Sequence, residues 1–404
     1  MNLGSTRMNI LYISYWNMGD GLTEATVFPS LRMLRELLPD AKIVFANIQR
    51  EKLVAGPPVL FDQLNILYSP IPSGSKIINK FRDFFHGPKM LQRMCIEHGI
   101  AKVIARGAPS GALAYLLWKS ARIPFYVESF EPHSDYMLES GVWNALDPRY
   151  FLQKDWERKQ KEYAAGLMPV ACSYKIKLVK ENVDSRKIRV VPCAVDSRQF
   201  AFDLHERNRL RQALGLDGNS IVGLYVGKYG GLYLAEDSFR IYKIFFEQVA
   251  RFALIILSPN EYHPWVLKQI NVYGLPRERV FVKSVAHHEV GAYCSMSDFA
   301  FATYKPGASK EYLSPVKVGE YWANGLPIFL TKGVGDEASM VENGFGGVLF
   351  DPKRINPSGL SDKINKLLEL SGSASIRQNI AKKGVEHRSI DKLREAYTYF
   401  LFQK

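Results

Sequence analysis

Cysteine is scarce in this sequence, and long apolar runs are lacking. The four cysteines stand far apart without paired spacing: Cys95, Cys172, Cys193 and Cys294. In a chain of 404 residues they predict neither a zinc site nor a disulfide framework. No run of about 18 or more apolar residues is present, so no membrane-spanning helix is expected. The start, MNLGSTRMNILYIS, also lacks the apolar core and cleavage site of a secretory signal, and we expect a cytoplasmic protein.

Acidic residues are too few to balance the basic ones. The 53 Lys and Arg against 40 Asp and Glu leave a formal net charge of +13. This charge favours nucleic acid, an anionic membrane surface or phosphorylated small molecules as partners. The sequence has no long basic run, zinc-finger spacing or aromatic RNA-binding signature, so nucleic acid is not expected. It also shows no acidic pair placed to hold a divalent metal, and we expect no metal or other cofactor.

Short apolar runs alternate with longer helical stretches along the whole chain. The runs lie at 8–15, 42–48, 101–107, 123–131, 166–173, 188–194, 252–258, 279–285, 298–304, 326–332 and 346–350, with a longer one, SIVGLYVGKYGGLYL, at 220–234. Such alternation predicts parallel strands joined by crossover helices, that is, doubly wound α/β sheets. The pattern stops in a polar stretch and restarts, so we predict two Rossmann-like domains facing a central cleft. The predicted parts are an N-terminal domain at 1–197, a linker at 198–218, a second domain at 219–375 and a helical tail at 376–404 that could return to the first domain.

The segment SPVKVGEYWANGLP places a lysine and a glutamate early in a predicted helix. Ser314 is a good N-cap and Pro315 suits the first helical position, so the helix is predicted to begin at Ser314. Lys317 and Glu320 are three residues apart and share one helix face. Lys317 and the free N–H groups of the first turn suit a diphosphate, and Glu320 could accept hydrogen bonds from a ribose diol. The alternative is an exposed pair that stabilises the helix by about 0.2–0.5 kcal/mol.

This segment, continued by GVGDEASMVENGFGGVLFD, resembles the signature of the group 1, or family 4, retaining glycosyltransferases of the GT-B fold. VACSYKIKLVKENVDSRKIRVVPCAVD, LYVGKYGGLY and GDGLT agree with that family in order and spacing. The resemblance implies transfer of a sugar from a nucleoside-diphosphate sugar to an acceptor hydroxyl with retention of configuration. The expected pathway is synthesis of a surface polysaccharide or glycolipid. A nucleotide-sugar epimerase of the same fold and a non-catalytic nucleotide-sugar-binding scaffold are the alternatives.

The resemblance also implies roles for single residues of the second domain. Glu320 matches the glutamate that binds the ribose, while Gly227 and Lys228 match the glycine and basic residue that meet the donor diphosphate. The family's second lysine falls near Tyr233, and Lys317 is our substitute for it. The first glutamate of the family pattern falls on a tyrosine beside Glu311. The further donor-binding candidates are Gly230, Val282, Ser309, Glu311, Leu313 and Ser314.

Three features of the first domain are also candidates. His133 follows a strand, where similar transferases place a histidine near the sugar, although a lone histidine is more often structural or exposed. Gly19 and Gly21 let the backbone approach the donor phosphate, or they form an ordinary tight turn. Residues 74–94 interleave aromatic and basic residues, which suits an anionic membrane carrying a lipid-linked acceptor. Packing of the same helix onto its own domain is the alternative.

Overall fold

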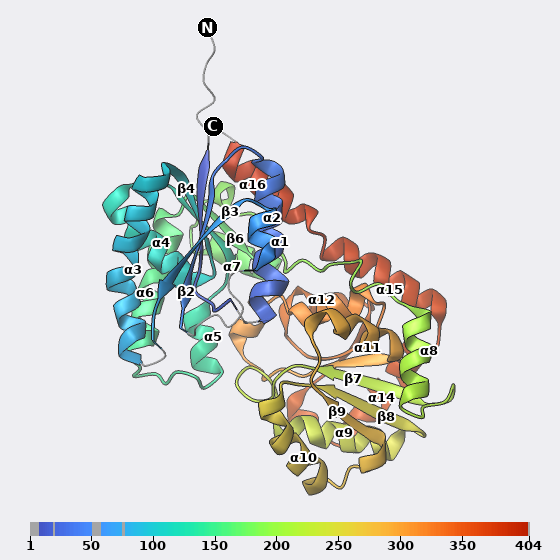
Figure 1. Ribbon diagram of the computed structural model, residues 1–404. Helices are drawn as coiled ribbons and strands as arrows, with labels where there is room; N and C mark the ends of the chain where they lie inside the picture. The colour runs from blue at the N-terminus through green and yellow to red at the C-terminus, as the bar shows by residue number, and fades with distance from the viewer. Residues whose placement is uncertain (1–7, 19–20, 51–57, 75–76, 403–404) are drawn as a thin grey trace. The chain divides into compact units, whose positions relative to one another are not determined.

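The computed structural model describes residues 8–18, 21–50, 58–74 and 77–402 of the chain (Figure 1). The chain divides into two compact units. The first unit holds Met1–Leu138, Trp143–Cys193 and Ile390–Lys404, and the second holds Glu139–Val142 and Ala194–Ser389. The range 198–218, which the sequence suggested as a linker, carries helix α8 (Leu204–Ala213) with Leu210 in the core of the second unit.

The first unit is built on a six-stranded parallel sheet with the strand order β3-β2-β1-β4-β5-β6. The strands are β1 (Asn9–Ser14), β2 (Ile43–Gln49), β3 (Ile66–Pro72), β4 (Ile100–Arg106), β5 (Phe125–Phe130) and β6 (Gly166–Pro169). The helices are α1 (Gly21–Leu37), α2 (Val59–Gln63), α3 (Ile77–His98), α4 (Ala108–Ala121), α5 (His133–Glu139), α6 (Pro148–Tyr163), α7 (Cys172–Lys180) and α16 (Asp391–Phe402). Figure 1 shows α3, α4 and α6 on one face of the sheet and α1, α2 and α16 on the other.

Two strand predictions for the first unit were wrong. Strand β3 was missed because its sequence, ILYSPIP, contains two prolines. Proline donates no backbone hydrogen bond, but β3 lies at the edge of the sheet, where proline is tolerated. Conversely, the run 188–194 forms no strand. It is attached to β6 by an isolated bridge between Ile188 and Leu167 and by hydrogen bonds from the Arg189 N–H to the Leu167 carbonyl and from the Val191 N–H to the Pro169 carbonyl.

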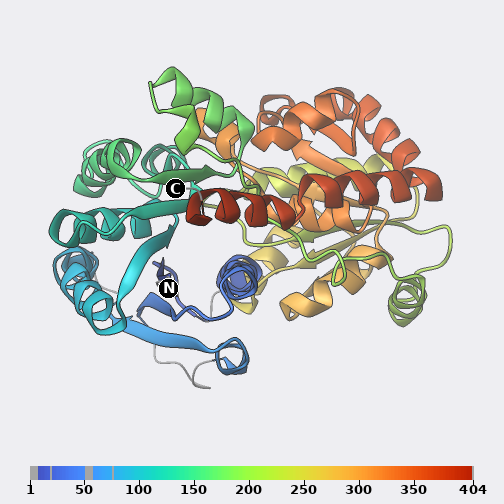
Figure 2. The ribbon, with the colours of Figure 1, turned by 90° about the horizontal axis from the view of Figure 1, so that it is seen from above.

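The C-terminal helix α16 completes the core of the first unit. Leu393, Tyr397 and Phe400 of this helix are buried in the same cluster as Tyr12 of β1. Figures 1 and 2 both show the red helix beside α1, against which it packs. The Tyr397 hydroxyl donates a hydrogen bond of 2.5 Å to the buried Glu128 carboxylate. The described part of the predicted tail, 376–402, is therefore mostly helical as expected, and its last helix is an integral part of the first unit.

The second unit repeats the architecture of the first. Its parallel sheet has the order β12-β11-β10-β7-β8-β9, which is the same winding read from the other edge. The strands are β7 (Ile221–Val226), β8 (Phe252–Leu257), β9 (Val280–Lys283), β10 (Phe299–Ala302), β11 (Ile328–Thr331) and β12 (Gly347–Phe350), and all six were expected from the sequence. The remaining helices are α9 (Glu236–Gln248), α10 (His263–Val272), α11 (Val290–Met296), α12 (Val316–Ala323), α13 (Gly335–Glu342), α14 (Pro357–Ser371) and α15 (Ala374–His387).

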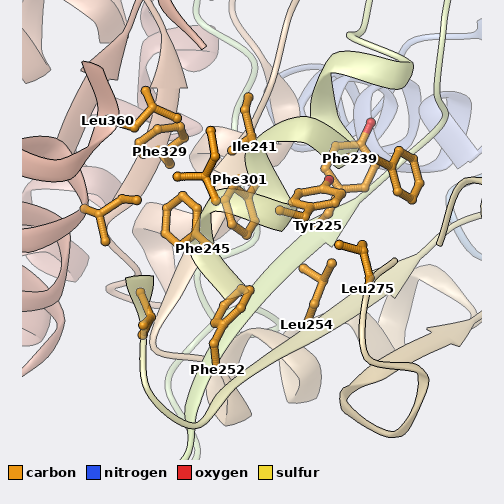
Figure 3. Close-up of a cluster of buried hydrophobic side chains, with 14 of the residues drawn as sticks. Tyr225, Phe239, Ile241, Phe245, Phe252, Leu254, Leu275, Phe301, Phe329 and Leu360 are labelled. Carbon is orange, nitrogen blue, oxygen red and sulfur yellow. The ribbon is translucent and has the colours of Figure 1, made fainter. Parts of the chain in front are cut away.

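Alternating side chains of the second sheet build a separate core on each face. In β7, Leu224 joins one cluster and Tyr225 the other, as the period of two along a strand requires. The face that carries Tyr225 is rich in aromatic rings, including Phe245, Phe301 and Phe329 (Figure 3). Neighbouring rings there lie 4.9 to 6.0 Å apart, many of them edge to face, which is the favoured arrangement for aromatic pairs.

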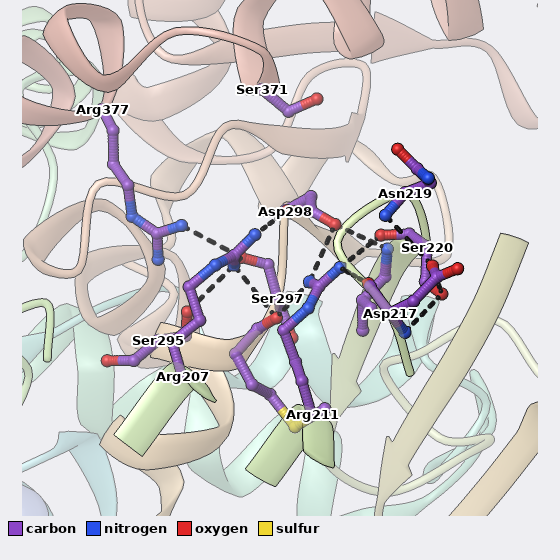
Figure 4. A network of polar contacts seen from close by, with 12 residues as sticks. Arg207, Arg211, Asp217, Asn219, Ser220, Ser295, Ser297, Asp298, Ser371 and Arg377 are labelled. Carbon is purple, nitrogen blue, oxygen red and sulfur yellow. Dashed lines mark hydrogen bonds and ion pairs between the residues drawn. The ribbon is translucent and has the colours of Figure 1, made fainter. Parts of the chain in front are cut away.

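Arginines bind the end of helix α11 and the aspartate that follows it (Figure 4). Asp298 pairs with Arg207 at 2.6 Å and Arg211 at 3.4 Å, and it accepts a hydrogen bond of 2.7 Å from the Val222 N–H. Arg207 and Arg377 also donate to backbone carbonyls at the C-terminus of α11. The negative end of the helix dipole and one carboxylate thus attract several cations and join α8, α11 and α15.

Candidate functional site

The strand order of the second sheet marks where a ligand is expected. The winding reverses between β7 and β10, and doubly wound sheets bind ligands at the carboxyl ends of the strands at such a point. Gly227 follows β7 directly, and Tyr304 follows β10 after one residue. The Tyr304 N–H donates a hydrogen bond of 2.8 Å to the Thr331 hydroxyl at the end of β11. This bond joins the ends of β10 and β11 at the sheet edge.

The ammonium group of Lys317 lies at this edge, surrounded by tyrosine rings. Its Nζ is 4.1 Å from the centroid of Tyr233, 4.7 Å from Tyr225 and 5.7 Å from Tyr304. The residue is only 8% exposed, and its Nζ has no hydrogen-bond partner among the described residues. Electron-rich ring faces stabilise an ammonium by cation–π attraction without using its hydrogen-bonding capacity. The three N–H donors of Lys317 are thus left for a ligand.

Burial controls the charge of this lysine. Removal from water lowers the pKa of Lys317 to about 7, although the nearby Glu320 carboxylate opposes the change. Burial, and then the Glu320 charge, raise the pKa of Tyr233 to about 12, so the ring stays neutral and supplies no anion. An anionic ligand would supply the missing counter-charge.

The glycine loop after β7 is shaped around the Lys317 side chain. Gly227 has a φ of 134°, and a Cβ atom added there would lie 2.7 Å from the Lys317 Nζ. A side chain would therefore displace the ammonium. Gly230 has a φ of 78°, which also favours glycine. Lys228 is exposed, and its backbone carbonyl accepts a hydrogen bond of 2.5 Å from the Tyr225 hydroxyl.

Glu320 lies one turn further along α12 and is also buried, at 5% exposure. Its Oε1 is 2.7 Å from the Nε2 of His287, in the loop after β9. Because both Lys317 and Glu320 are buried, the alternative of an exposed surface pair is wrong. Sequence reasoning missed His287, which lies 33 residues away, and the only local signal was a pair of histidines shortly after a strand.

The predicted N-cap of α12, Ser314, was wrong by one residue. The helix begins at Val316 with Pro315 as its N-cap. The Ser314 hydroxyl instead accepts a hydrogen bond from the fully buried Arg388, which also pairs with Glu337 at 2.6 Å. A buried guanidinium needs acceptors for its N–H groups, and this demand outcompetes helix capping. Ser314 therefore anchors the loop and does not cap the helix.

The other predicted residues of the second unit have different environments. The Ser309 N–H and hydroxyl donate to the carboxylate of Glu139, with the N–H at 3.0 and 3.1 Å from its oxygens. Leu313 is buried, Glu311 is exposed and Val282 is half-buried in β9. Ser309 and Leu313 therefore hold the loop in place, and nothing in their contacts assigns them to a ligand.

In the first unit, His133 is the first residue of α5 and is buried. Its ring lies 5.8 Å from that of Trp143 and 6.5 Å from that of Trp16, and its Nδ1 is 3.8 Å from the Glu131 carboxylate. The alternative of an exposed histidine is thus wrong. Gly21 is the first residue of α1, and Gly19 lies outside the described residues.

Two searches of the described residues found no candidates. Across residues 8–18, 21–50, 58–74 and 77–402, no group of three or more His, Cys, Asp or Glu side chains could hold a metal ion. No helix in the same ranges is both long and apolar enough to cross a membrane.

Comparison with known proteins finds similarity in structure. No family model and no curated protein matches the sequence. HepE from Anabaena, solved with UDP, has a TM-score of 0.70 at 13% identity, covering 98% of this chain and 99% of HepE. A glycosyltransferase from Rickettsia africae has a TM-score of 0.69 at 16% identity, covering 99% and 100%. A UDP-N-acetylglucosamine 2-epimerase has a TM-score of 0.63 at 12% identity, covering 98% and 97%. The two sheets with flanking helices match the Rossmann-like domains of the glycosyltransferases, and the chain has the GT-B fold.

Proposed function

We propose that the protein is a retaining glycosyltransferase that moves a sugar from a nucleoside-diphosphate sugar to an acceptor hydroxyl. The observation that carries this proposal is the buried ammonium of Lys317 at the switch point of the second sheet, with its N–H donors unused. The HepE structures contain UDP and UDP-glucose, so UDP is our first candidate for the leaving group. The acceptor would be a glycan or lipid-linked glycan in polysaccharide or glycolipid synthesis, handled at the cytoplasmic side.

The chemistry follows from the charges of the site. When the sugar leaves, negative charge builds on the diphosphate while the sugar becomes oxocarbenium-like. Lys317, the N-terminus of α12 and Lys228 would stabilise that charge, which lowers the barrier and makes a divalent metal unnecessary. Glu320 would bind the ribose diol, and His133 would position the donor sugar. The Gly227 backbone would lie against the diphosphate because no side chain intervenes.

An epimerase acting on UDP sugars is the second candidate, because a UDP-N-acetylglucosamine 2-epimerase shares the fold. An epimerase would convert its nucleotide sugar without any acceptor, whereas a transferase would release free UDP in proportion to the glycosylated acceptor. A scaffold with a decayed site is disfavoured by the burial of both Lys317 and Glu320. Product analysis with and without acceptor therefore separates the candidates.

Nucleotide binding is the first test. In a thermal-shift screen against UDP, GDP, ADP, CMP and their sugar conjugates, we expect one nucleotide to stabilise the protein selectively. The stabilisation should be about 2.7 kcal/mol at a ligand concentration of 100 times the Kd.

The Glu320→Ala substitution is the second test. It should keep the melting temperature of the free protein but abolish turnover of the donor. Exposed Glu386, replaced by alanine, is the matched control. No shift with any nucleotide, or full turnover by Glu320→Ala, contradicts the proposal.

We also propose that helix α3 contacts an anionic membrane. Exposed residues follow one another at helical spacing along it: Arg82, Phe85, Lys89, Arg93 and Ile96. Phe85 is 74% exposed. The adjacent residue Phe84 instead packs against Trp156, with ring centroids 4.2 Å apart, as the packing alternative expects for that side of the helix. Residues 75–76 of the predicted segment lie outside the described residues.

Vesicle binding tests this surface. We expect the full chain to sediment with vesicles containing phosphatidylserine, and the triple variant Arg82→Gln, Lys89→Gln, Arg93→Gln to lose most of that binding. Each basic residue near an anionic surface contributes about 1 kcal/mol. The control neutralises three exposed lysines of the second unit: Lys366, Lys382 and Lys383. Equal losses in the two triple variants, or no sedimentation of the parent, would show that α3 is not a membrane surface.

A further inference from the structure

The carboxylate of Glu320 is held by a histidine from a different part of the second unit. His287 begins a short 3-10 helix, His287–Glu289, between β9 and α11. Its Nε2 lies 2.7 Å from Glu320 Oε1, which is a short hydrogen bond for a nitrogen donor. Glu320 is buried, whereas the His287 side chain is 31% exposed. The histidine therefore lies between the buried carboxylate and the solvent.

A second contact sets the orientation of the His287 ring. The side-chain amide nitrogen of Gln199 donates to the His287 backbone carbonyl at 3.1 Å and lies 3.4 Å from Nδ1. An amide nitrogen only donates, so this arrangement makes Nδ1 an acceptor and gives the proton to Nε2. The Phe200 ring, 5.6 Å from the imidazole, packs against it. Nε2–H consequently donates to Glu320.

The geometry points to His287 as a positioning residue that holds Glu320 ready for a ribose diol. This inference rests on the proposed function. The hydrogen bond from His287 uses one lone pair of Oε1. Oε2 and the second lone pair of Oε1 would then accept hydrogen bonds from two neighbouring hydroxyl groups of the ligand. A carboxylate held in one orientation loses less conformational freedom when the ligand binds.

His287 also keeps Glu320 apart from Lys317. The two charges are three residues apart on one helix, a spacing at which Glu and Lys commonly pair. The carboxylate nevertheless faces His287, and the Lys317 ammonium faces the tyrosine rings. Without the imidazole, the buried carboxylate would lose its donor, and the Lys317 ammonium on the same helix face would offer a replacement. Such a pair would occupy both the ribose-binding and the diphosphate-binding group.

The test compares ribose and deoxyribose ligands. For the full chain we would titrate UDP, ADP, GDP and CDP and the 2′,3′-dideoxy form of each, and take the tightest nucleotide as the probe. The parent should prefer the ribonucleotide by at least tenfold, because its buried carboxylate loses two hydrogen bonds with the dideoxy form. His287→Ala should lower ribonucleotide affinity by about tenfold and dideoxynucleotide affinity far less, so the preference shrinks.

Three controls separate positioning from loss of structure. His288→Ala changes the exposed neighbouring histidine and should leave the preference intact. His287→Gln keeps an N–H donor and should therefore retain part of the preference that His287→Ala loses. In a Glu320→Ala background, His287→Ala should cause no further loss, because the two residues act as one unit.

Two outcomes would overturn the inference separately from the proposed function. If the parent protein prefers the ribonucleotide and the His287→Ala variant keeps this preference, His287 does not position Glu320. The proposed function is not affected by that result. The same conclusion follows if His287→Ala lowers the affinity for the ribonucleotide and for the dideoxynucleotide by equal factors. If the parent binds none of the four nucleotides, the proposed function and the positioning role both fail.

Discussion

Lys317→Met will lower the affinity for the nucleoside diphosphate at pH 7 by roughly 100-fold without lowering the melting temperature, because a buried ion pair between ammonium and phosphate is lost. The methionine side chain has similar length and packs well against aromatic rings. It also removes the cost of burying an ammonium that has no hydrogen-bond partner among the described residues. Calorimetric titration and thermal unfolding of the same samples measure both quantities.

The pH dependence of binding follows from the lowered pKa of Lys317, about 7. The diphosphate binds the protonated form, so affinity in the parent should fall by up to about tenfold per pH unit from pH 7 to 9. The terminal phosphate has finished titrating in this window, since its pKa is near 6. Lys317→Met should show no such slope. Lys268→Met, at an exposed position on α10, is the control and should keep the parental affinity and slope.

The stability of the free protein should change with pH in the opposite direction to binding. The folded pKa of Lys317, about 7, lies below its ordinary value of 10.5, so the unfolded chain binds more protons between these values. Stability from this residue therefore rises as pH increases through that range. The advantage of Lys317→Met in melting temperature should be largest near pH 6 and shrink by pH 10. A constant difference would show that Lys317 is charged throughout.

Asp298→Ala will destabilise the second unit by about 3–5 kcal/mol, the usual cost of removing one partner from a buried ion pair. Arg211 is buried and Arg207 is partly buried, and both lose their carboxylate. The Val222 N–H at the start of the central strand β7 loses its acceptor as well. Urea denaturation followed by circular dichroism measures the change in the free energy of unfolding.

The matched control for this prediction is Asp237→Ala. Asp237 pairs with Arg240 at 2.9 Å on the surface of α9, with both side chains about half exposed. Such a pair contributes about 0.2–1 kcal/mol. Asp298→Asn should lie between the two, because an amide oxygen can still accept from the Val222 N–H. If Asp298→Ala and Asp237→Ala cost the same, the arginine cluster does not hold α8, α11 and α15 together.

The alternation of apolar runs predicted the fold well, because strand and helix periodicity depend on neighbours in the sequence. The errors fell where distant segments decide the outcome. The segment ILYSPIP at 66–72 forms a strand because β2 pairs with it at the edge of the sheet. The run 188–194 forms no strand because it meets the short strand β6 through an isolated bridge. Ser314 caps no helix because Arg388, distant in the sequence, takes its hydroxyl.

Local sequence patterns were enough to predict the two Rossmann-like units, the glycine loop at Gly227 and the spacing that puts Lys317 and Glu320 on one face of α12. The burial of both side chains, the tyrosine rings around Lys317 and the contact of His287 with Glu320 became visible in the folded chain. These features could not be predicted because charge state and hydrogen bonding depend on what surrounds a side chain in space. Those surroundings come from the ends of β7 and β10, which are neighbours in the sheet, and from the loop after β9, and these segments are far apart in the sequence.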